Sequence, residues 1–400
     1  MALLAKGYGW LPDLRRSRGA RTVATRLMGL RATALEGPAA ARFFYDEDHV
    51  RRAGAIPEPV QATLFGKGAV HTLDGEAHRV RKALFVALLM REEGIASLVE
   101  RATSAWDDAA KEWARRGPIV LFEESADVLS GAVCRWTGIP VSDGDVPAIA
   151  RDLQALVDGF ATAGPRHWRA RRARGRRERE LARLVEDVRA GRATVDEGSA
   201  VDVVARHVEA DGTQLSPKLC AVELLNIIRP TVAISWFLSF SAHALIRRPE
   251  CRERLASGDV AYAEAFAHEV RRFYPFAPFI GGRAPRDVEW DGERIPENSM
   301  VLLDLYGQNH DPDVWGDPYA FRPERFVGRD IDAFELVPQG GGDPRSGHRC
   351  PGEQITVAVL SALAVRLARL PFDVPEQDLS IPLSRIPTRP RSGVVLQVRG

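Results

Sequence analysis

Cys350 lies in a segment whose composition could turn a cysteine into a metal ligand. The sequence there reads PQGGGDPRSGHRCPGE (338–353), a glycine-rich loop that runs directly into a helical pattern. A thiolate ligand needs hydrogen-bond donors and positive charge, and the N–H groups of a tight glycine loop and of a following helix N-terminus supply both. A lone cysteine is more often an inert buried thiol, but the glycines, His348 and Arg349 favour a ligand. Thiolate ligation of iron pushes electron density onto the metal and favours O–O cleavage.

Two further segments combine arginines with carboxylates. The sequence EVRR (269–272) places Glu269 and Arg272 one turn apart on a predicted helix, and FRPERF (321–326) offers more arginines for a buried ion network. Either pair alone would be read as a surface contact. With NHDPDVW (309–315) between them and the cysteine loop last, the combination resembles the cytochrome P-450 family of haem-thiolate enzymes over essentially the whole chain.

This resemblance implies a fold and a cofactor. The fold would be mainly α, the cytochrome P-450 fold, in which residues 1–400 form a single domain with a helical part and a smaller β-rich region. The cofactor would be haem b, with the thiolate of Cys350 as the axial ligand of the iron. Glu269 and Arg272 would support the cysteine loop.

The central helix departs from the common pattern of that family. Most members carry an acid and an alcohol there that deliver protons to bound oxygen, whereas this chain reads NIIRPTVA (226–233). Its cysteine loop also lacks the usual leading phenylalanine. Both departures resemble the fatty-acid peroxygenase subgroup, whose co-substrate is hydrogen peroxide, and so do TLFGKGAVH (63–71), GPRHW (164–168) and YPFAPF (274–279).

Arg229 has the strongest chemical implication in the central helix. It shares a helical face with Asn226 and Ala233, and no acidic residue of the same helix lies within one turn of it. An unpaired arginine in an apolar helix would cost several kcal/mol, so an anion is expected. One alternative is a structural ion pair with another segment. The other is a bidentate clamp for the carboxylate of a long-chain fatty acid.

A clamped carboxylate would also explain the missing acid and alcohol. It can take a proton from one oxygen of hydrogen peroxide and return it to the other, which is general acid-base work by the substrate. Oxidation would follow at the carbons nearest the carboxyl group and give alpha- or beta-hydroxy acids, with decarboxylation to a terminal alkene as a further outcome. By the subgroup resemblance we expect Arg229, Pro230 and His71 to be catalytic. For His71 the alternative is a surface histidine or one that only supports its neighbours.

The subgroup resemblance also assigns contacts to the substrate and to the haem. The alkyl channel would be lined by Phe65, Phe160, Phe276 and Phe279, although any one phenylalanine could be plain core. The haem propionates need cations, and the resemblance assigns them Arg52, His78, Lys82 and Arg349. A surface position is the alternative for Arg52, because residues 46–52 are charged.

The composition limits the partners. The 55 basic and 54 acidic residues give a formal net charge of +1, so no overall field attracts nucleic acid or an anionic membrane. Nine arginines lie between residues 166 and 183, but Glu178, Glu180 and Glu186 interleave with them, as on a solvated helix face. We expect no nucleic-acid partner and no obligatory redox partner.

The elements that must position these residues are mostly helices. Residues 83–272 show helical periodicity, as in 98–113 and 146–160, and residues 221–246 are apolar over a membrane-spanning length. A glutamate and the Arg229-Pro230 step in that segment favour a core helix over a membrane span. Short strands are predicted at 287–290, 293–295, 300–305 and 393–398, and a helix at 352–370.

The start of the chain and the cysteines favour the cytoplasm. Residues 1–13 hold too short an apolar stretch for a signal peptide, and the four cysteines lie far apart, without the close pairs of a zinc site. Two other functions stay open. A reductase-fed monooxygenase could use the arginine-rich segment for docking, but the absent acid-alcohol pair counts against it. A non-catalytic haem sensor would have no need of Arg229.

Overall fold

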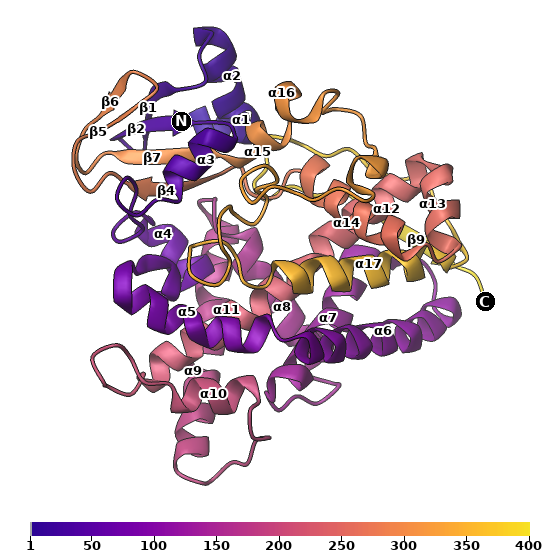
Figure 1. Cartoon of the computed structure of the whole chain (residues 1–400). Helices are drawn as coiled ribbons and strands as arrows, with labels where there is room; N and C mark the ends of the chain where they lie inside the picture. The colour runs from indigo at the N-terminus through magenta and orange to yellow at the C-terminus, as the bar shows by residue number, and fades with distance from the viewer. Residues whose placement is uncertain (1) are drawn as a thin grey trace.

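The computed structural model describes residues 2–400 of the chain (Figure 1). Helices make up most of the molecule, and a four-stranded sheet lies beside them, together with the first helices of the chain (Figure 1). The predicted mainly α fold with a smaller β-rich region is confirmed. The longer helices are α2 (Trp10–Arg18), α5 (Gly75–Leu89), α6 (Glu92–Arg115), α7 (Leu121–Thr137), α8 (Val146–Asp158), α9 (Pro165–Arg189), α11 (Pro217–Val232), α12 (Ile234–Arg247), α13 (Pro249–Ala256), α14 (Val260–Phe273) and α17 (Glu353–Arg369).

Shorter elements connect these helices. The short helices are α1 (Ala2–Lys6), α3 (Pro38–Phe44), α4 (Glu58–Val60), α10 (Ala200–Arg206), α15 (Leu305–Asn309) and α16 (Pro312–Trp315). The strands are β1 (Val23–Leu27), β2 (Leu30–Leu35), β3 (Ile119–Val120), β4 (Phe279–Arg283), β5 (Val288–Trp290), β6 (Glu293–Ile295), β7 (Met300–Asp304), β8 (Phe372–Asp373) and β9 (Val395–Val398).

The central helix is the long apolar segment expected from the sequence. It runs through α11 and α12 with one interruption at Ala233, and 94% of its most apolar window is buried. Ser216 caps its start by accepting the N–H of Leu219 at 3.3 Å. Pro230 lies inside α11, where it lacks the N–H of a normal helical bond, and the helix is interrupted within a turn of it. By length and composition this helix could cross a membrane, but here it is a core helix.

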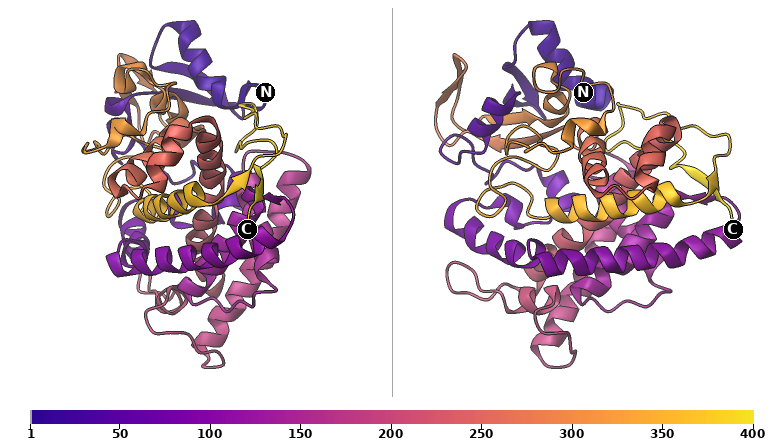
Figure 2. Two further views of the ribbon diagram at one scale, coloured as in Figure 1. Left: turned by 90° about the vertical axis from the view of Figure 1, so that its right-hand side faces the viewer. Right: turned by 45° about the vertical axis from the view of Figure 1, so that its right-hand side comes forward.

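The helix that follows Cys350 is packed between two others. α17 lies along α6 and against α14, and the three stay side by side in both further views (Figure 2). Its apolar residues Val359, Leu360 and Leu363 are fully buried in the main core. The observed bounds agree with the predicted helix at 352–370. The cysteine loop is therefore anchored at its C-terminal end by a helix whose inner face lies in the main core.

The main sheet has the strand order β1-β2-β7-β4. β2 and β7 are parallel, with Ala34 opposite Leu302, and β7 pairs antiparallel with β4, with Ile280 opposite Leu303. Every residue of β7 is buried, as expected of a strand inside a sheet. The predicted strands at 287–290, 293–295, 300–305 and 393–398 correspond to β5, β6, β7 and β9.

The arginine-rich helix α9 has one exposed side and one buried side. The exposed residues of its outer side agree with the predicted solvated face of alternating charge and include Arg169, Arg172, Arg179 and Glu180. Arg174 differs, because its side chain is buried and donates to the carbonyl of Leu64 at 3.0 Å while pairing with Glu178 at 2.8 Å. The inner side of α9 thus contacts the segment that carries Phe65. All four cysteines are free.

Candidate active site

Cys350 ends the glycine-rich loop, directly before α17. Its N–H donates to the carbonyl of Gln339 at 3.0 Å, and Gln339 Nε2 lies 3.8 Å from Sγ. Burial raises the pKa of the Cys350 thiol, although the N–H of Gly352 and the charge of Lys82 oppose this effect. The thiol would therefore keep its proton unless a metal takes the proton's place.

The cysteine loop is braced by Arg271 and Glu353, two residues to which the sequence assigned no role. Arg271 donates from Nε to Gln339 Oε1 at 3.0 Å and forms an ion pair with Glu353. Glu353 in turn accepts from Arg349 Nε at 2.7 Å. Arg271 thus holds both Gln339, in the loop, and Glu353, at the start of α17. The signal available in the sequence was only that Arg271 stands next to Arg272.

The pair Glu269 and Arg272 supports a different segment. Arg272 donates to both oxygens of Glu269 at 2.7 and 2.8 Å and to the carbonyls of Asn309 and Pro318 at 2.7 and 2.9 Å. Arg325 approaches Glu269 at 3.2 Å, as the predicted ion network required. These contacts brace the chain between residues 309 and 325, while the direct contact to the cysteine loop comes from Arg271.

Three of the expected propionate-binding residues are buried near the loop. Arg52, His78 and Lys82 are each at most 6% exposed, and none forms an ion pair within residues 2–400. The surface alternative for Arg52 is therefore wrong: its guanidinium lies 4.1 Å from the ring centre of Phe44. Burial lowers the pKa of Lys82 to about 8 and that of His78 to about 3. Arg349, the fourth expected residue, turns its guanidinium to Glu353.

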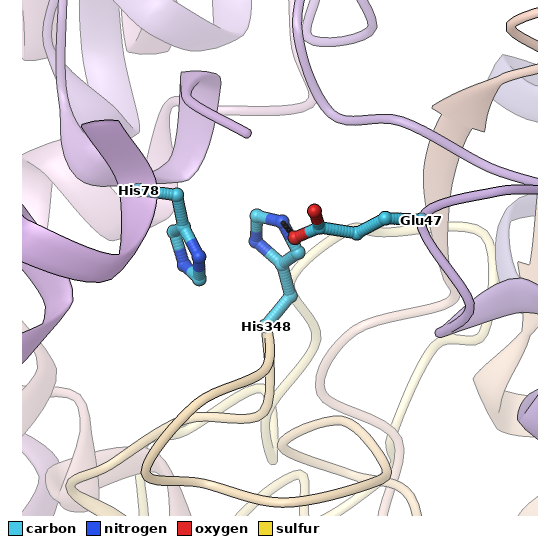
Figure 3. Close-up of side chains that lie close together, drawn as sticks. All are labelled: Glu47, His78 and His348. Atoms are coloured by element: carbon cyan, nitrogen blue, oxygen red, sulfur yellow. Dashed lines mark ion pairs between the residues drawn. The ribbon is translucent and has the colours of Figure 1, made fainter. Parts of the chain in front are cut away.

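His348 joins this group, although the sequence analysis gave it no role of its own. Figure 3 shows His78 and His348 face to face beside Glu47, and the two rings are 3.9 Å apart between centres. His348 Nε2 lies 3.5 Å from a Glu47 oxygen and 3.4 Å from an oxygen of Asp74. Burial raises the pKa of Asp74, but the hydrogen bonds from His348 and two backbone N–H groups outweigh it and lower that pKa to about 2.

By ligand type, Glu47, His78 and His348 could also hold a metal ion. The surrounding charge argues against this, because the positive groups of Lys82 and Arg52 both act on His78. Buried cations beside a histidine ring favour the binding of an anionic group, such as a carboxylate, over the binding of a metal ion. The buried Nδ1 of His78 has no hydrogen-bond partner in the described part of the chain and is available to such a group, whereas Nε2 of His348 already lies beside the carboxylates of Asp74 and Glu47.

Arg229 approaches the same region from α11. It is 6% exposed, and its Nη2 donates to Asn226 Oδ1 at 3.2 Å. Its Nε is buried without a partner among residues 2–400. Burial and the nearby charge of Arg174 lower the pKa of Arg229 to about 9, with Cys350 opposing them. Because arginine keeps its proton in proteins, this shift marks a buried positive charge without a counter-ion.

His71 and Phe65 lie against this arginine. The Phe65 ring is 5.7 Å from the Arg229 guanidinium carbon and 4.4 Å from the His71 ring. Burial, followed by the charges of Arg229 and Lys82, keeps the pKa of His71 well below its ordinary value, so the ring is neutral at pH 7. Gly66, at φ +88, lets this segment approach α11, since a side chain there would come within 2.6 Å of Val222.

The other expected channel residues are spread more widely. Phe276 packs on Phe237 with 5.1 Å between ring centres, Phe279 packs on Trp10 at 5.7 Å, and Phe160 lies in the turn between α8 and α9. Among the four phenylalanines, Phe65 is the one whose described contacts include Arg229. A separate hollow of about 790 Å³ opens beside Cys350 along α17, and neither Phe65 nor Arg229 lines it.

The arrangement fits a haem group. A cysteine just before α17 would supply the iron ligand, while Arg52, Lys82 and the unpartnered Nδ1 of His78 would face the propionates. Buried cations without carboxylate partners need such an anionic group. Fold and site together define a haem-thiolate oxidoreductase.

Comparison with known proteins leads to the same class. The family model described as cytochrome P-450 matches residues 244–393. Carnosic acid synthase of Rosmarinus officinalis is 38% identical over 112 residues, which are 26% of this chain and 21% of that protein. Cytochrome P-450 1A2 of Oryctolagus cuniculus is 26% identical over 326 residues, which are 71% of this chain and 63% of that protein. The matches thus span less than two thirds of these curated relatives.

Solved structures match over the whole length. Cytochrome P-450SP alpha (CYP152B1) in complex with (R)-ibuprofen is 43% identical, with a TM-score of 0.96 over 99% of this chain and 98% of that one. A variant of cytochrome P-450 OleT in complex with arachidonic acid is 36% identical, with a TM-score of 0.96 over 99% of this chain and 95% of that one. The chain belongs to the cytochrome P-450 family, and within it to the fatty-acid peroxygenase subgroup.

Proposed function

We propose that this enzyme uses hydrogen peroxide to oxidise long-chain fatty acids beside the carboxyl group, giving alpha- or beta-hydroxy acids and some terminal alkenes. The observation that carries the proposal is Arg229, a buried cation without a carboxylate partner in residues 2–400 and with an unpartnered Nε. A fatty-acid carboxylate is the anion that would complete it through a bidentate pair.

Arg229 would bind and orient the substrate by its head group. Because the carboxylate is fixed, the first carbons of the chain lie nearest the reacting centre, and Phe65 covers them from water. The clamped carboxylate accepts a proton from one oxygen of hydrogen peroxide and returns it to the oxygen that leaves as water. Haem, held by Cys350, supplies the iron chemistry that activates peroxide and oxidises the C–H bond.

The solved relatives support a carboxylic-acid substrate. Arachidonic acid and ibuprofen, the molecules bound in two of them, are both carboxylic acids. One is a long chain and the other a compact aromatic acid, so the carboxyl group is the feature that they share. This agrees with a site organised around Arg229 rather than around the shape of the tail.

We also propose that the enzyme works in the cytoplasm and without an obligatory redox partner. The four free cysteines suit a reducing compartment. Hydrogen peroxide already carries the two electrons that a reductase would otherwise pass to O₂, and the substrate carboxylate transfers its proton, so no reductase is needed.

The deciding experiment uses purified holoenzyme, saturated fatty acids of several lengths and hydrogen peroxide, with no reductase. We expect hydroxy acids by gas chromatography and mass spectrometry, and almost no product from the matching methyl esters. Product that forms only with a reductase and reduced nicotinamide cofactor would identify a conventional monooxygenase. Efficient turnover of an ester would show that the carboxylate is not needed.

A further inference from the structure

A buried glutamate on the central helix contacts the partner of Arg229. Glu223 is fully buried, and Glu223, Asn226 and Arg229 follow one another at three-residue intervals along α11. The glutamate accepts three hydrogen bonds. Its Oε1 receives the N–H of Val70 at 2.8 Å and Nη1 of Arg81 at 2.6 Å, and its Oε2 receives Nδ2 of Asn226 at 3.0 Å.

These contacts fix which way the amide of Asn226 points. Its Nδ2 donates both to Glu223 and to the carbonyl of Phe65 at 2.9 Å. An ionised carboxylate and a backbone carbonyl can only accept, so the NH₂ group must face them. The oxygen Oδ1 is then left facing Arg229 and accepts from Nη2 at 3.2 Å. The reversed amide would set the NH₂ group against a guanidinium, donor against donor.

We propose that Glu223 is a positioning residue for the substrate clamp. Through Asn226 it holds one Nη of Arg229 and leaves the Nε side of the guanidinium open to a carboxylate, an inference that rests on the proposed function. By binding the N–H of Val70 it also holds the segment that carries Phe65 and His71 against the same helix. One carboxylate therefore sets the relative position of the clamp and of the groups that cover it.

A glutamate that only balanced the charge of Arg81 would not need all the contacts that Glu223 makes. Arg81 balances the charge of Glu223 through a single oxygen, and Arg81 is itself paired with Glu209, which accepts from its Nε at 2.7 Å. The second oxygen of Glu223 is not needed for that ion pair and is directed at Asn226. Glu209 thus provides a matched control, a glutamate that binds the same arginine but forms no hydrogen bond with Asn226 in the described residues.

The test measures fatty-acid binding rather than turnover. Holoenzyme carrying Glu223→Gln is titrated with tetradecanoic acid, followed by the substrate-induced shift of the Soret band, and with imidazole as a ligand that has no carboxylate. A glutamine can satisfy Arg81 and Val70 only by turning its NH₂ group toward Asn226, which reverses that amide. We expect the Kd for tetradecanoic acid to rise roughly tenfold or more, the scale of one charge-assisted hydrogen bond, with the Kd for imidazole unchanged.

Two further variants keep the inference testable. Asn226→Ala, which removes the link and leaves Glu223 in place, should weaken tetradecanoic acid binding as much as Glu223→Gln does, and the double variant should be no weaker than either. Glu209→Gln should leave that Kd unchanged. Equal weakening for tetradecanoic acid and imidazole, or additive effects of the two substitutions, would overturn the positioning role. If Arg229→Ala itself leaves the Kd for tetradecanoic acid unchanged, the proposed function fails instead.

Discussion

Two buried arginines of this protein, Arg272 and Arg229, are held in opposite ways. Arg272 is fully buried and donates to both oxygens of Glu269 and to several backbone carbonyls. Arg229 is almost as buried, yet its one hydrogen-bond acceptor in residues 2–400 is the amide oxygen of Asn226. The charge and the hydrogen-bond donors of Arg272 are satisfied within the protein. Those of Arg229 are satisfied only when an anion from outside the chain binds.

The difference separates a structural arginine from a binding one. A buried ion pair with all its hydrogen bonds made is costly to break but gives no place for a ligand. A buried cation without a counter-ion destabilises the folded protein until an anion binds, so that binding relieves an existing cost. The region around Glu269 and Arg325 therefore holds the chain between residues 309 and 325 in place, and the region around Arg229 and Phe65 is the one prepared for substrate.

The largest effect is expected from replacing Cys350, the predicted haem ligand. Cys350→Ser should abolish the strongly red-shifted Soret band of the reduced carbonyl complex and all peroxide-driven oxidation, because oxygen is a far poorer donor to iron than thiolate sulfur. The absorption spectrum of the reduced, carbon monoxide-treated variant checks this directly. Retention of the band would remove Cys350 as the ligand.

On the substrate side, Arg229→Ala should reduce peroxide-driven fatty-acid oxidation by roughly 10²-fold or more, because positioning and proton transfer are lost together. Haem content should stay normal. The unfolding temperature should stay the same or rise, since an uncompensated buried charge is removed. The matched variant Arg229→Lys keeps the charge without the bidentate fork and should retain intermediate activity. A sharp fall in the unfolding temperature of Arg229→Ala would place Arg229 in the same structural class as Arg272.

The reverse result is expected for the structural pair. Glu269→Gln leaves Arg272 and Arg325 buried without their carboxylate and should destabilise the protein by about 3–5 kcal/mol, the usual cost of removing one partner of a buried ion pair. The measurement is the unfolding temperature of the holoenzyme together with its haem content. Activity per bound haem should remain close to normal. A loss of activity per haem with unchanged stability would contradict the division between the two regions.

The sequence predicted elements better than contacts. The continuous apolar length of residues 221–246 identified the central helix, which is buried on nearly all sides. Helical periodicity identified α17, because one face of that helix is buried. The sequence also indicated that no acid of the central helix lies within one turn of Arg229, and among the described residues Arg229 forms no ion pair; Glu223 of the same helix contacts its partner Asn226 instead. The roles of Arg271 and His348 were missed, since their partners Gln339 and Asp74 lie on other segments and only the folded chain brings them together.

The smallest predicted effect concerns His71, which lies on the substrate side with its ring 4.4 Å from that of Phe65. Burial and the charge of Arg229 lower its pKa strongly, so the imidazole is neutral before substrate binds. A carboxylate on Arg229 would cancel the nearest positive charge and raise that pKa again, which lets His71 share a proton with the substrate head group. The position and charge of that head group decide whether the oxidised carbon gains a hydroxyl or carbon dioxide leaves.

His71→Gln keeps a donor and an acceptor but cannot become charged, so it should lower the ratio of alkene to hydroxy acid by less than roughly tenfold and leave hydroxylation in place. The ratio is measured by gas chromatography at equal conversion for both proteins. An unchanged ratio would reduce His71 to a packing partner of Phe65.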